Sequence, residues 1–355
     1  MRDKSKSFLE RYLNNPSPTG FEAEGQKIWL EYLKSYIDGY DLDVYGSVAA
    51  VLNPGREYKV VVEAHADEIS WFVNYISSDG FIYVIRNGGS DHQIAPSMRV
   101  YLHGDKGIVP GVFGWPAIHV RKPEKEENPS LKNIVIDVGA SSKEEVLTMG
   151  IHPGTVITYQ DKVTYLNQKF ICGRALDNRI GGFIIAEVVR TLREKKIDLP
   201  YTLYAVNAVQ EEIGLRGAEM ISRKLKPDVA IVTDVCHDTS TPQYDPKEQG
   251  DQRCGKGPVL TFGPAVQNNL LNHLIRVAEG HQIPFQYAAV SRSTGTDTDA
   301  FAYSGEGVAS ALISLPLRYM HTTVEMVHQD DLENVIALIV AYLSDLKAGT
   351  NYAYF

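Results

Sequence analysis

The sequence predicts an α/β protein in which a mixed sheet is flanked by helices and a β-rich domain is inserted. The first observation is an alternation of buried-strand and amphipathic-helix patterns, which runs to about residue 70 and resumes after about residue 165. The second is a change of character between Trp71 and Tyr165, where short alternating strands are separated by glycine turns. We therefore assign residues 1–70 and 165–355 to the main domain and residues 71–164 to the insertion.

The first part of the main domain contains two helix patterns followed by two strand patterns. Residues 5–13 and 22–37 have apolar side chains at helical spacing, with a turn at residues 16–20 between them. Strands are expected at residues 47–52 and 59–64. Within the insertion, Asp79-Gly80 predicts a hairpin between strands at residues 73–76 and 81–85, and Gly104 to Gly107 separates two more strands. The one helix expected there covers residues 142–148, with Ser141 or Ser142 followed three residues on by Glu144 or Glu145 as a capping box.

Strand and helix patterns alternate again after the insertion. The expected helices cover residues 180–195, 218–224, 269–279 and 332–346, and the expected strands cover residues 201–209, 229–233, 258–262, 285–290 and 308–315. A polar loop over residues 236–257 is unusually long, and loops of that length beside a site often shape a substrate pocket.

Composition excludes several classes of function. The net charge of −9 without a basic cluster argues against nucleic acid as a partner. Cys172, Cys236 and Cys254 have no C-x-x-C spacing and cannot form a full disulfide set, which favours a reducing compartment. The N-terminus lacks an apolar signal core, and the longest apolar run near the end, residues 335–343, is too short to span a bilayer. We expect a soluble cytoplasmic protein without a membrane partner.

Five apolar segments each lead to a His, Asp or Glu, and these residues are the candidate site. Carboxyl ends of strands in open α/β sheets meet where ligands bind. Two histidines with three or four carboxylates are the ligand set of a dinuclear zinc-type hydrolase. Two adjacent glutamates at one such end can act as a metal ligand and a general base. The candidate residues are His65, Asp67, Asp177, Glu211, Glu212, Asp234 and His321.

Each candidate also has a structural alternative. The Glu211-Glu212 pair is compatible with a solvated acidic turn, and His65 with a buried core histidine. Asp177 is placed to cap the helix expected at residues 180–195, a role that is compatible with metal binding. Asp234 is compatible with a strand-end turn.

Five motifs together resemble those of the tetrahedral, glutamyl and deblocking aminopeptidase family of dinuclear zinc metallopeptidases. They are H-A-D-E-I, A-L-D-N-R, Q-E-E-I-G-L-R-G-A, T-D-V-C and R-Y-M-H, and the match runs from the turn at residues 16–22 to about Asp331. The resemblance implies a zinc aminopeptidase-like catalytic domain of the phosphorylase/hydrolase type, interrupted by a β-barrel or PDZ-like dimerisation domain. It also implies that dimers assemble into a tetrahedral dodecamer.

Position by position, the resemblance implies a role for each candidate. Asp177 bridges two divalent metal ions, His65 and Asp234 bind one ion, and Glu212 and His321 bind the other. Glu211 is the general base, and Asp67 holds His65 in its metal-binding tautomer. The ions are expected to be zinc, although cobalt or manganese would accept the same oxygen and imidazole ligands.

The chain departs from the family at two positions beside these candidates. Ala66 stands where methionine is usual, which would widen the floor of the site, and Asn178 stands where a second aspartate is frequent, which puts local metal affinity in doubt. The segment from Thr294 to Asp299, in which Gly295 and Asp297 fit the family's G-T-D, is expected to line the substrate pocket.

The sequence and the resemblance together predict a metal-dependent aminopeptidase that acts on short peptides. One alternative is an endoglucanase-like glycoside hydrolase that uses Glu211 and Glu212 as acid and base. Adjacent carboxylates are poorly placed for the ~5–9 Å separation that this chemistry needs, and such an enzyme would not need the histidines. The other alternative is a catalytically silent peptide-binding assembly protein, which would require a broken metal shell.

Overall fold

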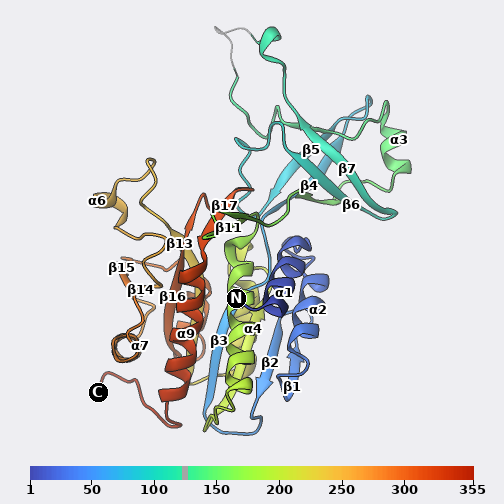
Figure 1. Ribbon diagram of the computed structural model, residues 1–355. Coiled ribbons are helices and arrows are strands. Elements are labelled where there is room, and N and C mark those ends of the chain that lie inside the picture. Colours follow the sequence, from blue (N-terminus) through green and yellow to red (C-terminus); the bar gives the residue numbers. More distant parts are fainter. Residues whose placement is uncertain (122–126) are drawn as a thin grey trace.

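The computed structural model describes residues 1–121 and 127–355 and shows an α/β domain with a closed β-barrel at one end (Figure 1). Helices pack on both faces of a mixed sheet in the α/β domain. The barrel stands beyond the carboxyl ends of the central strands, and residues 66–69 and 160–163 connect it to the α/β domain. The predicted fold, a mixed α/β domain with a β-rich insertion, is therefore confirmed.

The described part of the main sheet has eleven strands, with β14 and β15 attached through β16. The order of the others is β1-β2-β12-β3-β13-β16-β17-β11-β10, and the four central strands β12, β3, β13 and β16 run parallel. Their carboxyl ends therefore meet at one edge. The strands are β1 (Gly39–Leu42), β2 (Val48–Leu52), β3 (Lys59–His65), β10 (Thr164–Leu166), β11 (Phe170–Gly173), β12 (Thr202–Ala208), β13 (Val229–His237), β14 (Val259–Phe262), β15 (Gln286–Ala289), β16 (Ala309–Arg318) and β17 (Glu325–His328).

The helices of this domain are divided between the two faces of the sheet. On one face α4 packs against β3 and is covered in turn by α1, α2 and α9, so it is buried on nearly all sides. On the other face α8 packs against β13, β16 and α5. The helices are α1 (Asp3–Asn14), α2 (Ala23–Leu33), α4 (Leu176–Glu194), α5 (Arg216–Leu225), α6 (Pro246–Gln249), α7 (Asn268–Gly280), α8 (Asp297–Ala302) and α9 (Gln329–Asp345).

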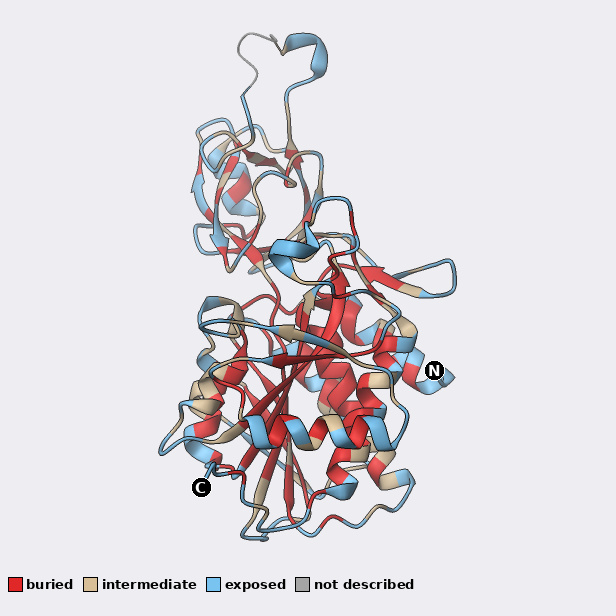
Figure 2. Cartoon of the chain, turned by 90° about the vertical axis from the view of Figure 1, so that its left-hand side faces the viewer, coloured by how far each residue is buried: buried red, intermediate tan, exposed pale blue. Residues whose placement is uncertain are grey.

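Burial is densest in the central strands and α4 (Figure 2). The parallel strands read as continuous apolar runs because both of their faces are covered. Val60, Val61 and Val62 of β3 are all fully buried, for example. This packing makes the central strands a rigid support for the residues at their carboxyl ends.

The barrel closes in the order β4-β5-β8-β7-β6-β9 and has an apolar core of its own. Trp71 and Phe113 meet edge to face inside it, with ring centroids 5.6 Å apart. The two predicted turns are present, with Gly80 and Gly107 at positive φ, and Ser142 accepts a hydrogen bond from the Glu145 backbone N–H as expected. Its elements are β4 (Ser70–Ile76), β5 (Ile82–Asn87), β6 (Arg99–Gly104), β7 (Gly107–Gly114), the 3₁₀ helix Ile118–Val120, β8 (Val135–Asp137), α3 (Lys143–Thr148) and β9 (Val156–Tyr159).

Several element boundaries differ from those expected. The strand predicted at residues 229–233 continues to His237, because Asp234 to His237 pair with Ser314 to Leu317 of β16. The helix predicted at residues 22–37 ends at Leu33. The short strands β1 and β17 were not expected. No helix in the two described stretches is both long and apolar enough to cross a membrane.

Candidate metal centre

The seven candidate residues converge at the carboxyl edge of the parallel strands. His65 is the last residue of β3, and Glu211 and Glu212 lie in a 3₁₀ turn shortly after β12. Asp234 lies inside β13 rather than after it, because pairing with β16 continues past it. Residues from five separate parts of the chain thus lie in one place, as strand polarity predicts.

Asp177 lies between the two histidines. Its Oδ1 is 3.3 Å from Nε2 of His65, and its Oδ2 is 3.3 Å from Nε2 of His321. Asp177 and Asn178 have non-helical backbone angles, so the regular part of α4 begins after them. One carboxylate therefore presents a separate oxygen to each imidazole.

Three further carboxylates surround these groups. Glu212 Oε1 lies 3.4 Å from Nε2 of His321. Glu211 Oε2 and Asp234 Oδ1 lie 3.8 Å and 4.0 Å from Nε2 of His65. Two sets of three donors have their ligand atoms within 4.8 Å of one another, and they share His65: His65, Asp177 and Glu212, and His65, Glu211 and Asp234.

The centre gathers four carboxylates that are largely buried. Burial raises the pKa of Glu211 to about 10 and the pKa of Asp234 to about 7, and neighbouring carboxylates add to both shifts. Burial also opposes the charged form of Asp177, but the imidazoles of His321 and His65 outweigh it, so its pKa lies below the ordinary value. Carboxylates that repel one another in this way, together with two imidazoles, fit divalent cations, which would relieve the repulsion.

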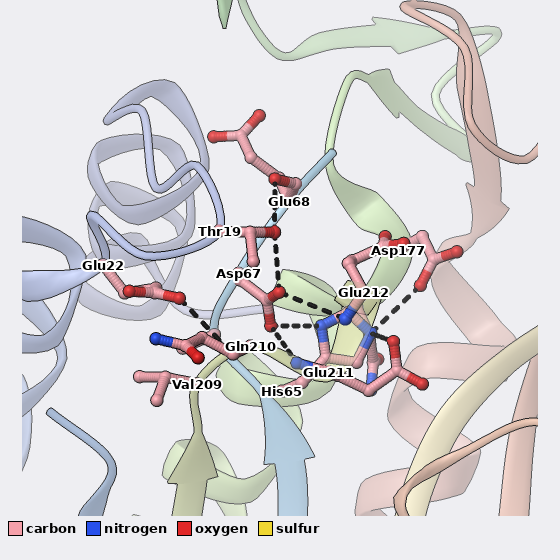
Figure 3. A network of polar contacts seen from close by, with 12 residues as sticks. Thr19, Glu22, His65, Asp67, Glu68, Asp177, Val209, Gln210, Glu211 and Glu212 are labelled. Carbon is pink, nitrogen blue, oxygen red and sulfur yellow. Dashed lines mark hydrogen bonds and ion pairs between the residues drawn. The ribbon is translucent and has the colours of Figure 1, made fainter. Parts of the chain in front are cut away.

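Asp67 joins the histidine to the turn that carries the two glutamates (Figure 3). Its Oδ1 lies 3.3 Å from Nδ1 of His65 and accepts a hydrogen bond from the Glu211 N–H at 3.0 Å. Its Oδ2 accepts from the Glu212 N–H at 3.2 Å and from the Thr19 hydroxyl at 2.8 Å. A single buried carboxylate thus fixes both a candidate ligand and the backbone of the candidate base.

Glu22 supports Gln210, the residue directly before the two glutamates. Gln210 has a left-handed backbone with φ +59°, and its N–H donates to Glu22 Oε1 at 3.2 Å (Figure 3). The same oxygen accepts from the Gly20 N–H at 2.8 Å. Burial, with a contribution from Asp67, raises the pKa of Glu22 to about 8.

Glu325 is a supporting residue that the sequence did not reveal. Its Oε2 accepts from the Asp177 N–H at 3.1 Å and its Oε1 from the His321 N–H at 2.7 Å. His321 has φ +61°, and this hydrogen bond holds its strained backbone. The only signal in the sequence is one acidic residue among the apolar residues of a short strand.

The inserted domain also reaches the centre, through Gly88 and Gly89 after β5. A Cβ on Gly89 would lie 2.6 Å from Nδ1 of His321, and one on Gly88 would lie 3.2 Å from Cβ of Glu212. Such a close approach of backbone to side chain requires glycine at position 89.

A cavity of about 960 Å³ opens beside the centre. The segment predicted as a long loop, residues 236–257, contributes His237 from the end of β13 and Glu248, Gln249, Gly250 and Gln252 to its wall. Thr294, Gly295, Thr296 and Asp299 also line it, as expected for their segment. Asp297 does not: it is buried beside Glu63, and burial together with that neighbouring carboxyl raises its pKa well above the ordinary value.

Comparisons with known proteins place this geometry in a family context. The family model described as M42 glutamyl aminopeptidase matches residues 46–338. A lysyl aminopeptidase of Pyrococcus furiosus is 35% identical over 96% of this chain and 97% of its own length. The TET aminopeptidase of a marine sediment archaeon, Thaumarchaeota archaeon SCGC AB-539-E09, superimposes with a TM-score of 0.92 at 30% identity, over 97% of this chain and 98% of that one. The TET1 peptidase of Pyrococcus horikoshii superimposes with a TM-score of 0.85 at 27% identity, over 96% of this chain and 100% of that one. That relative can assemble into a tetrahedron or a large octahedral shell.

Proposed function

The chain belongs to the M42 glutamyl aminopeptidase family, and we propose that it is a metal-dependent aminopeptidase that releases single residues from the N-termini of short peptides. Membership supports a hydrolase of the aminopeptidase class. The observation that carries the metal-dependent part is the placement of Asp177, whose two oxygens face the imidazoles of His65 and His321. A carboxylate in that position suits a bridge between two divalent ions.

The proposed ligand assignment follows the contacts around that bridge. Glu212 and His321 would bind one ion with Asp177, since their side chains lie 3.4 Å apart. His65 and Asp234 would bind the other ion. Zinc is the expected metal, and the same donors would accept cobalt or manganese. When bound, the ions would polarise the scissile carbonyl and lower the pKa of the attacking water.

Glu211 is the proposed general base. Its carboxylate borders the cavity and is not needed as a ligand if His65, Asp177 and Asp234 bind the nearer ion. Its Oε2 would take a proton from the attacking water and return it to the amine that leaves. Asp67 would keep His65 Nε2 free for a metal by holding a proton on Nδ1, from which its Oδ1 is 3.3 Å away.

Assembly is the second part of the proposal. We propose that residues 1–70 and 165–355 form the catalytic domain, that residues 71–164 form a barrel or PDZ-like dimerisation domain, and that dimers assemble into a tetrahedral dodecamer. The family membership and the tetrahedron formed by the Pyrococcus horikoshii relative support it.

The two alternatives, a glycoside hydrolase and a catalytically silent assembly protein, are less well supported. The complete set of candidate ligands, which neither alternative needs, surrounds Glu211 and Glu212.

The test is hydrolysis of short peptides by the purified chain before chelation, after chelation, and after zinc or cobalt is restored. Release of single N-terminal residues that disappears and returns with metal is the expected result. Turnover of a β-glucan that resists chelation would instead support the glycosidase. Two bound metals per chain without turnover of any peptide would overturn the aminopeptidase proposal. The family name and the Pyrococcus furiosus relative point to different first residues, glutamate and lysine, so the panel must vary that residue.

A further inference from the structure

The cavity beside the centre carries negative charge beyond that of the candidate ligands and base. Glu248 and Asp299 line it, and no lysine or arginine of the described residues does. His237 also lines it, but burial lowers the pKa of this histidine, so its imidazole adds no positive charge at neutral pH. Two divalent ions would balance Asp177, Glu211, Glu212 and Asp234, and the two outer carboxylates would remain uncompensated.

Glu248 and Asp299 differ in what they have left to offer a ligand. Both oxygens of Asp299 accept hydrogen bonds from the Thr294 N–H, and Oδ2 also accepts from the Gly295 N–H, so this carboxylate is used to shape its own loop. Glu248 is exposed, and its side chain forms no hydrogen bond or ion pair with any described residue. Glu248 is therefore the carboxylate whose full hydrogen-bonding capacity faces the cavity.

The wall also has apolar side chains among its polar ones. Leu215, Ala289, Val290 and Leu312 border the same space. Lysine and arginine place a methylene stem on apolar surface while the charged end reaches a polar partner. An apolar wall combined with one unpaired carboxylate is the environment that such a side chain needs.

We propose that this cavity selects peptides whose first residue is lysine or arginine, and that Glu248 binds the cationic end of that residue. The inference rests on the proposed aminopeptidase function. An acidic first residue would be repelled by Glu248 and Asp299 with no lysine or arginine of the described wall to offset them, and an apolar one would leave Glu248 without a partner.

The experiment measures peptide binding separately from turnover. Zinc-loaded Glu211→Gln protein is titrated in a calorimeter with tripeptides that differ only in their first residue: lysine, norleucine or glutamate. Norleucine has the lysine stem without its charge. We expect the lysine peptide to bind about fivefold more tightly than the norleucine peptide, as for an ion pair at a solvent-accessible rim, and the glutamate peptide to bind most weakly. Adding Glu248→Gln should bring the lysine-to-norleucine ratio close to one.

The matched control is Glu279→Gln, an exposed glutamate of α7 outside the cavity, which should leave the ratio unchanged. Equal binding of lysine and norleucine peptides before any change at position 248 would overturn the proposal. So would an equal loss for all three peptides in the Glu248→Gln protein, which would place Glu248 at the common α-amino group. Absence of turnover by the unmutated chain would count against the aminopeptidase function alone, because the binding ratio is read without it.

Discussion

Oδ1 of Asp67 lies 3.3 Å from Nδ1 of His65, on the opposite side of the imidazole from the Nε2 that faces Asp177. The same carboxylate accepts the backbone N–H groups of Glu211 and Glu212. The position of the candidate base and the orientation of a candidate ligand therefore depend on one side chain.

Replacement of Asp67 by asparagine should weaken metal binding by roughly 10–100-fold, the range seen when a partner of a metal-binding histidine is lost. An amide has one acceptor oxygen, so its NH₂ group would face N–H or O–H donors that now point at a carboxylate. Competition with a chromophoric chelator measures the affinity. Asp79→Asn in the exposed hairpin turn is the control, and an unchanged affinity at position 67 would contradict the supporting role.

Replacement of Glu211 by glutamine should lower kcat by roughly 10²–10⁴-fold while metal content stays the same, because a general base is lost and no ligand is. Peptide hydrolysis gives kcat, and elemental analysis gives the metal content of the same sample. Near-normal turnover would remove Glu211 from the role of base. Loss of metal together with activity would make it a ligand instead.

Replacement of Glu325 by alanine should destabilise the fold by about 2–5 kcal/mol, because the buried backbone N–H of Asp177 and the part-buried N–H of His321 would lose their acceptor. Urea unfolding of the metal-free protein measures this directly. Glu333→Ala on the exposed surface of α9 provides the comparison. A loss as small as that of the control would show that other acceptors replace Glu325.

Glu22 should make stability depend on pH. Its pKa is raised from 4.5 to about 8, so between these values the folded chain keeps a proton that the unfolded chain has released. The contribution of Glu22 to stability is therefore greatest below about pH 4.5 and falls as pH rises towards 8. Glu22→Gln keeps an acceptor oxygen without the titration, so it should gain stability relative to the unmutated protein as pH rises. The free energy of unfolding of both proteins is measured with urea at several pH values across this range. A difference between them that stays constant with pH would show that the pKa of Glu22 is not raised.

Replacement of Gly89 by alanine should displace the His321 ring, because the new Cβ would lie 2.6 Å from its Nδ1. We expect roughly tenfold weaker metal binding, comparable to the loss of a supporting contact. Gly114→Ala, where a Cβ meets nothing within 4 Å, is the matched control in the same barrel. Equal affinities of the two variants would show that the loop yields instead of His321.

The pattern of polar residues at strand ends predicted which candidate residues would lie together, because its signal is local. His65 and Glu211 follow continuous apolar runs, and the parallel order of their strands brings such ends together. Asp234 was found for the same reason, although its strand continues beyond it. His321 also follows an apolar run, but its assignment rested most on the resemblance to a family.

The supporting residues could not be predicted in the same way. Glu325 acts on the backbone of residues 177 and 321, and no periodicity links those positions. Glu63 lies in an apolar run, and that run would predict the same strand with any other buried residue at position 63. The side chain that faces it, Asp297, comes from a helix far along the chain. Such contacts follow from the tertiary fold and leave no spacing in the sequence.

Because Gly88 and Gly89 lie close to Glu212 and His321, ion binding at the centre would be linked to the position of the barrel. An ion that fixes these two side chains favours the position of the barrel loop that accommodates them, and thermodynamic linkage is reciprocal. A neighbouring copy that held the barrel in this position would therefore raise the affinity for the ion by the same factor by which the ion strengthens the contact between copies. Metal concentration and protein concentration would then act on the same equilibrium.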